Sequence, residues 1–67
     1  MKKKYLIVAF ADIAINDIHG DLNSATVCYP QESCESREIA EGLILSKYSE
    51  YEWADFFEIK EVYYRDS

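Results

Sequence analysis

Residues 5–10, YLIVAF, are apolar at every position. A β-strand directs alternate side chains to opposite faces of its sheet, so a strand with this sequence has apolar residues on both faces. This pattern is typical of a central strand that is covered on both sides. The rest of the chain is therefore expected to pair with this strand or to pack on it.

Two further segments have the composition of strands. Residues 22–29 alternate between apolar and polar positions, which predicts a half-buried strand that ends at Pro30. The polar segment 16–21 joins this strand to the first, and Gly20 supplies the positive φ that closes the hairpin. Residues 56–64 form the last strand, in which a change of apolar phase predicts a bulge near Lys60 or Glu61.

One amphipathic helix is predicted between the second and third strands. Ser33 is the expected N-cap, and the helix should end near Lys47 or Tyr48. At 100° per residue, the acidic positions of this segment fall opposite its apolar positions. The acidic positions are Glu35, Glu38 and Glu41, and the apolar stripe is Ile39, Ala40, Leu43 and Ile44.

The order strand, strand, helix, strand predicts a single α+β domain over residues 1–67. Short connections and a right-handed crossover place the third strand beside the first, giving a three-stranded antiparallel sheet in the order 2-1-3. The helix covers one face of this sheet. The other face is left open and requires a second copy of the chain or a different protein to cover it. The rings expected on the open face are Tyr5, Tyr29, Tyr63 and Tyr64.

The charge of the chain limits its partners. The net charge is −6, and three of the seven basic residues are the lysines at positions 2–4. From Tyr5 onward, 7 − 3 = 4 bases face 13 acids, a balance of −9. Direct binding of nucleic acid requires Lys and Arg to neutralise phosphates, so this balance argues against it. A basic protein or ribonucleoprotein surface is the complement that we expect.

The N-terminal segment 1–15 has the basic and apolar regions of a signal peptide, but Asp12 interrupts the apolar run and no small-residue cleavage site follows. No segment reaches the ~18 uninterrupted apolar residues of a membrane-spanning helix. We therefore expect a cytoplasmic protein without a membrane partner. In that compartment Cys28 and Cys34 should be reduced and buried rather than joined in a disulfide.

Residues 17–20, DIHG, resemble the first D-x-H-G motif of the calcineurin-like metallophosphoesterases. That resemblance implies metal binding by Asp17 and His19. A dinuclear centre needs further ligands, and His19 is the only histidine in the chain. A Ca²⁺ loop built on Asp17, His19 and Asp21 would lack its bidentate Glu. We interpret the segment as a polar turn and expect a protein that is not an enzyme, with no metal and no cofactor; a fragment of a metallophosphoesterase-like domain is the third-ranked hypothesis.

Residues 49–58, SEYEWADFFE, combine four acids with four aromatic residues and contain no base. Phe57 is expected to be buried. Tyr and Trp are enriched at interface hot spots, and carboxylates beside them bind Arg side chains. Together with the acidic side of the helix, this segment predicts a partner-binding surface. Its residues are Glu35, Glu38, Glu41, Tyr48, Glu50, Tyr51, Glu52, Trp53 and Asp55.

The whole-chain pattern is a lysine-rich start, an apolar strand, a polar hairpin, a short acidic helix and an aromatic final strand. It is similar to small proteins of bacteriophages and mobile elements, among them the anti-CRISPR proteins. This resemblance implies a non-enzymatic inhibitor that mimics the charge of nucleic acid and blocks a basic nucleic-acid-binding surface in the host cytoplasm. The alternative is a homo-oligomeric structural or accessory protein, such as a homodimer, whose open sheet face packs on itself.

The interpretation of the D-x-H-G segment can be tested directly. Because the remaining ligands of a dinuclear centre are missing, the chain should neither bind Mn²⁺ tightly nor hydrolyse a generic phosphoester. Calorimetric titration measures the first property and a phosphatase assay the second. Turnover that disappears in a His19→Ala variant would contradict the interpretation.

Overall fold

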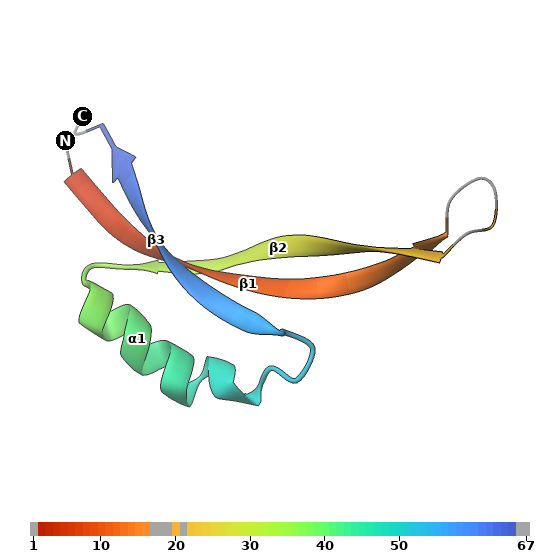
Figure 1. The fold of residues 1–67 in the computed structure, drawn as a ribbon. Helices are drawn as coiled ribbons and strands as arrows, with labels where there is room; N and C mark the ends of the chain where they lie inside the picture. Colours follow the sequence, from red (N-terminus) through yellow and green to blue (C-terminus); the bar gives the residue numbers. More distant parts are fainter. Residues whose placement is uncertain (1, 17–19, 21, 66–67) are drawn as a thin grey trace.

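The structure is a computed structural model that describes residues 2–16, 20 and 22–65. Three strands form an antiparallel sheet in the order β2-β1-β3, and the helix α1 lies on one face of it (Figure 1). This arrangement confirms the predicted α+β fold and strand order. The elements are β1 (Lys2–Asn16), β2 (Leu22–Cys34), α1 (Arg37–Ser46), the 3-10 helix η1 (Tyr48–Glu50) and β3 (Phe56–Tyr64).

The centre of the sheet is β1, as its apolar sequence predicted. Ile7 and Ala9 are fully buried, and Val8 is 5% exposed although it points to the opposite face. Ile7 pairs with Ile59 of β3, and Ala9 pairs with Phe57, so these four side chains lie on the face that α1 covers. Strands on both sides shield this part of β1 from solvent, because β1 is paired on both edges.

The core lies between α1, η1 and this face of the sheet. Ala40 is fully buried beneath α1, where its small side chain lets the helix approach the sheet. Phe57 packs against the core, as predicted. Four buried residues form its centre: Ile7, Cys34, Ala40 and Tyr48. Partly buried residues packed around them are Tyr5, Leu43, Ile44, Tyr51, Phe57 and Ile59.

β2 is longer than predicted, since Pro30 does not end it. The strand continues to Cys34, and its register with β1 shifts between Leu6 and Val8, the latter paired with Pro30. β2 is an edge strand, and proline is tolerated at edges and bulges because its missing N–H removes no ladder bond there. The prediction placed the strand end at the wrong residue for this reason.

The helix begins later than predicted. Ser36, not Ser33, is the N-cap, and its hydroxyl accepts a hydrogen bond from the Ile39 N–H at 3.2 Å. Ser33 lies within β2 and pairs with Leu6. Ile39 is 52% exposed and does not belong to the core stripe, because a step of 100° from Ala40 turns it away from the sheet.

The predicted bulge in β3 is also wrong. β3 pairs with β1 in one continuous register from Tyr64 to Phe56, and the irregularity lies between β1 and β2 instead. The change of apolar phase has a different cause: Phe57 and Ile59 face α1, whereas Val62 and Tyr64 point to the opposite face of the sheet. Both faces of β3 therefore carry apolar side chains.

No described residue outside the sheet covers the face opposite α1. The side chains on this face differ from those that the sequence predicted. Of the four expected tyrosines, only Tyr64 has the strand parity of that face. Tyr5 and Tyr63 share the parity of Ile7, and Tyr29 pairs with Ala9, so all three lie on the helix side. In their place, Phe10 and Phe56 stack on the open face with ring centroids 4.7 Å apart. Other apolar residues of this face are Leu6, Val8 and Val62.

The first hairpin extends well beyond the rest of the fold (Figure 1). β3 pairs with β1 only as far as Phe10, whereas β2 pairs with it as far as Asn16. We call the projecting part, residues 11–16 of β1 and 22–27 of β2, the hairpin arm. The radius of gyration is 15.4 Å, against about 11 Å for a compact chain of this length. Gly20 has φ 83°, as the predicted turn requires.

Candidate protein-binding surface

The predicted binding residues lie in the segment from the end of β2 to the start of β3: Glu35 precedes α1, and the others lie on α1, η1 and the connection to β3 (Figure 1). Their exposure separates them into two groups. Tyr48 is only 2% exposed, and Tyr51 is half-buried. The exposed members are Glu35, Glu38, Glu41, Glu50, Glu52, Trp53 and Asp55.

Lys3, Lys4, Lys47 and Lys60 pair with carboxylates that lie outside the exposed acids of α1, η1 and the segment after it. Their Nζ atoms lie close to carboxylate oxygens in four ion pairs: Lys3–Glu61 at 3.9 Å, Lys4–Glu35 at 3.8 Å, Lys47–Glu32 at 3.1 Å and Lys60–Glu58 at 3.0 Å. No cation within the described ranges pairs with the remaining carboxylates of α1, η1 and the segment after it. Four of them, Glu38, Glu41, Glu50 and Glu52, are named here the acidic surface; the fifth, Asp55, accepts a hydrogen bond from the backbone of β1.

Trp53 follows Glu52 of the acidic surface in the chain, and its ring packs on two other rings. It meets Tyr29 of β2 edge to face, with centroids 5.5 Å apart, and its centroid is 5.6 Å from that of Tyr51. Tyr51 in turn contacts Tyr48 and Phe57, which belong to the core. Trp53 is nevertheless 48% exposed. Its ring is therefore held by packing on one side and is available for contact on the other.

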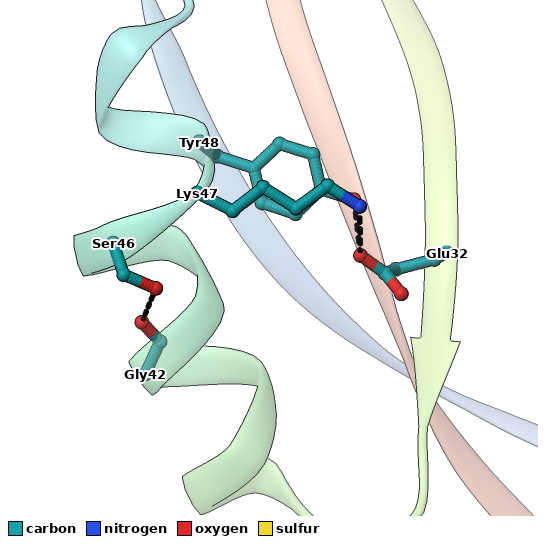
Figure 2. Close-up of polar contacts among 5 residues, drawn as sticks. All are labelled: Glu32, Gly42, Ser46, Lys47 and Tyr48. Carbon is teal, nitrogen blue, oxygen red and sulfur yellow. Dashed lines mark hydrogen bonds and ion pairs between the residues drawn. The ribbon is translucent and has the colours of Figure 1, made fainter.

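Tyr48 has a structural role that the sequence did not indicate. Its hydroxyl donates a 2.6 Å hydrogen bond to Oε1 of Glu32, and Nζ of Lys47 lies 3.1 Å from the same oxygen (Figure 2). This pair of contacts joins the end of α1 to β2. Because its ring is buried in the core, Tyr48 does not belong to the binding surface. Nothing in the sequence indicated the role of Glu32, because the predicted strand ends at Pro30 and Glu32 lies beyond that end.

The same contacts shift two pKa values in opposite directions. Burial and the hydrogen bond to the Glu32 carboxylate raise the pKa of Tyr48. The hydrogen bonds from Tyr48 and Lys47 lower the pKa of Glu32. Burial also raises the pKa of the Cys34 thiol, which is the reverse of the change that a reactive thiolate needs. Cys28 is exposed, against expectation, and neither cysteine forms a disulfide.

Asp55 also has a structural role. Its N–H donates to the carbonyl of Phe10 at 2.7 Å, and its Oδ2 accepts from the N–H of Asp12 at 2.9 Å. β3 begins at Phe56, opposite Phe10, so it offers no backbone acceptor to the Asp12 N–H. The Asp55 carboxylate takes the place of that acceptor. Asp55 fixes the start of β3, and only its remaining carboxylate oxygen is left to meet a partner.

The candidate metal ligands Asp17, His19 and Asp21 lie outside the described residues. Within the ranges 2–16, 20 and 22–65 there is no group of three His, Cys, Asp or Glu residues that could hold a metal ion. That part of the chain also forms no pocket. Among the same residues, no helix has the length and apolar character needed to cross a membrane.

No protein-family model, curated protein or solved structure matches this chain. The features of the chain that bear on function are therefore those of its own surface: the exposed carboxylates of the acidic surface, and Trp53 packed on Tyr29 and Tyr51.

The contact between Tyr48 and Glu32 makes a prediction about pH. Above the ordinary glutamate pKa of 4.5, Glu32 is ionised in both states and its contribution to stability is complete. As the pH falls below that value and through the lower native pKa, the unfolded chain takes up this proton first, and the contribution is lost. Urea unfolding at a series of pH values should show this loss.

The Glu32→Gln and Tyr48→Phe variants should each have a smaller loss of stability on acidification than the original chain. Glu38→Gln is the matched control, because Glu38 is an exposed glutamate that takes part in none of the ion pairs among the described residues. Parallel stability curves for all four proteins would show that the contact does not contribute.

Proposed function

We propose that this chain is a small non-enzymatic inhibitor that binds a basic, nucleic-acid-binding surface of another protein, as its resemblance to anti-CRISPR proteins implies. The observation that carries the proposal is the exposure of the acidic surface, Glu38, Glu41, Glu50 and Glu52, together with that of Trp53, which follows Glu52 in the chain. Four lysines of the described residues, Lys3, Lys4, Lys47 and Lys60, pair with carboxylates at other places.

Electrostatics would give this surface its selectivity. Four carboxylates on consecutive elements produce a negative field that attracts a cationic surface and repels nucleic acid. In the absence of the inhibitor, the Arg and Lys side chains of the partner would bind the phosphates of its nucleic acid. The inhibitor therefore competes with nucleic acid for the same side chains. Exposed charges are screened beyond ~8 Å at physiological ionic strength, which makes the encounter sensitive to salt.

Trp53 would supply the contact area that the carboxylates lack. A Trp ring that is half exposed and held by Tyr29 and Tyr51 loses little conformational freedom when it binds. It can also stack on an Arg guanidinium whose charge is met by Glu50 or Glu52. Acids and ring together favour an arginine-rich partner.

The homo-oligomeric alternative is favoured by one specific observation. The sheet face opposite α1 carries the stacked pair Phe10 and Phe56, and Phe56 and Val62 are 48% and 39% exposed. A structural or accessory protein could bury this face against another copy. Both activities can coexist, because the acidic surface lies on the other side of the sheet.

The proposal is tested by recovering a partner on the immobilised chain, eluting it with salt, and measuring whether the chain displaces nucleic acid from it. Displacement that saturates at one inhibitor per nucleic-acid site supports the proposal. A partner that binds the inhibitor and its nucleic acid at the same time would contradict it.

Reversing the charge of Glu50 and Glu52 to Lys should slow association with this partner by roughly tenfold at low salt, with a smaller effect on dissociation. Surface plasmon resonance over a range of salt concentrations measures both rates. The matched control reverses Glu58 and Glu61, which changes the net charge equally but in β3, where each pairs with a lysine. If both variants behave alike, the position of the acids does not matter and the charge-mimicry mechanism fails.

Replacing Trp53 with Ala should instead raise the dissociation rate by roughly 30-fold, which corresponds to a loss of ~2 kcal/mol. Phe56→Ala is the control, since Phe56 is equally exposed at 48% but lies on the opposite face. Circular dichroism checks that both variants are folded. An unchanged dissociation rate in folded Trp53→Ala would remove Trp53 from the interface.

A further inference from the structure

The hairpin arm has one apolar and one polar face, and neither α1 nor β3 covers it (Figure 1). Ile13 and Ile15 are 38% and 43% exposed on the face that continues the helix side of the sheet. Asp12 lies on the other face, where its carboxylate accepts a hydrogen bond from the Thr26 hydroxyl at 2.6 Å. A hairpin of two strands is marginally stable without a third strand.

One edge of the arm has unused backbone groups. The N–H of Asp12 and the carbonyl of Phe10 point toward β3, since both bond to Asp55. Backbone groups alternate in direction along a strand, so those of Ala14 and Asn16 point the same way. β3 does not reach them. The open edge therefore offers the carbonyl of Asp12 and the N–H and carbonyl groups of Ala14 and Asn16.

The sequence of this edge is nearly symmetric. Residues 12–16 read DIAIN, which is the same in both directions except at its ends. The two ends, Asp12 and Asn16, differ only in that one is the acid and the other its amide. Antiparallel pairing of two identical strands about a two-fold axis requires each residue to meet its mirror position. With the axis at Ala14, Asp12 lies opposite Asn16, and Ile13 lies opposite Ile15.

We propose that two copies of this chain pair through β1 at the open edge, antiparallel and in register at Ala14. Ala14 of each copy exchanges two hydrogen bonds with its counterpart. The N–H of Asn16 donates to the carbonyl of Asp12 in each direction, giving two more, and the Asp12 N–H keeps its bond to Asp55. The two arms then form a four-stranded sheet.

A second copy fits this edge better than an unrelated strand. The register brings isoleucines together on the apolar face and places no carboxylate opposite another in the described strands. It also uses four of the five backbone groups of the open edge, namely the carbonyl of Asp12, both groups of Ala14 and the N–H of Asn16; the Asn16 carbonyl is left over because the Asp12 N–H keeps its bond to Asp55. None of the four carboxylates of the acidic surface belongs to the pairing edge of β1, and the acid of the segment after η1 that contacts this edge, Asp55, is held there by its own hydrogen bonds to Asp12 and Phe10.

The test replaces Ala14 with Pro. Because the Ala14 N–H points to the open edge and not to β2, the single chain keeps its ladder, while the pair loses its two central hydrogen bonds. Ser24→Pro is the matched control: Ser24 pairs with Ala14, so its N–H points to the outer edge of β2. Sedimentation velocity should show dimers for the original chain and for Ser24→Pro. The dissociation constant of the dimer should be at least roughly tenfold higher for Ala14→Pro.

Amide hydrogen exchange of the original chain provides a second measurement, should either proline variant fail to fold. Exchange at Ala14 and Asn16 should slow as the protein concentration rises, while exchange at the outward-facing amide of Ser24 stays unchanged. A chain that remains monomeric throughout would overturn the proposal. So would a dimer that survives Ala14→Pro, or one in which the Ala14 amide exchanges at the same rate at all concentrations, since the contact would then lie elsewhere, for example on the open sheet face.

Discussion

The packing of α1 on the centre of β1 is the interaction on which the remaining structure depends. Ile7 and Ala40 are both fully buried in the same cluster, at the one place where strands on both edges of β1 and the helix meet. Cys34 and Tyr48 complete this cluster from the two ends of the crossover. A chain of 67 residues has little core to spare, so the position of the helix fixes which faces are covered and which side chains are left exposed.

The position of the helix also organises the charges. Lysines of β1 and β3 neutralise Glu35, Glu58 and Glu61, and Lys47 supports the contact between Tyr48 and Glu32. The acids that remain unpaired among the described residues are therefore concentrated on α1 and the segment after it. Exposed ion pairs contribute little to stability, so this distribution matters more for the field around the protein than for folding.

The hairpin arm shows what a small core leaves unfinished. β3 ends its pairing at Phe10, and Asp55 takes the position of the next strand residue with its side chain. Beyond that point β1 has one open edge and exposed isoleucines, features that soluble proteins usually shield. The arm and the acidic surface are separate, so one region can join two copies while the other remains accessible.

The sequence by itself determined the strand order, the existence of one helix and the excess of acid, because these follow from apolar periodicity, chain connectivity and composition. It also indicated that Phe57 packs toward the core, where the structure places it partly buried, and that Trp53 follows a carboxylate in the chain. Only the tertiary structure decided the rest. Pro30 remains in β2 because an edge position needs no N–H, and Ser36 caps α1 because Ser33 is taken into that longer strand. Tyr48 is buried rather than exposed, and the Glu32 carboxylate, 16 residues earlier, accepts the hydrogen bond of its hydroxyl. A contact between such distant segments leaves no local pattern in the sequence.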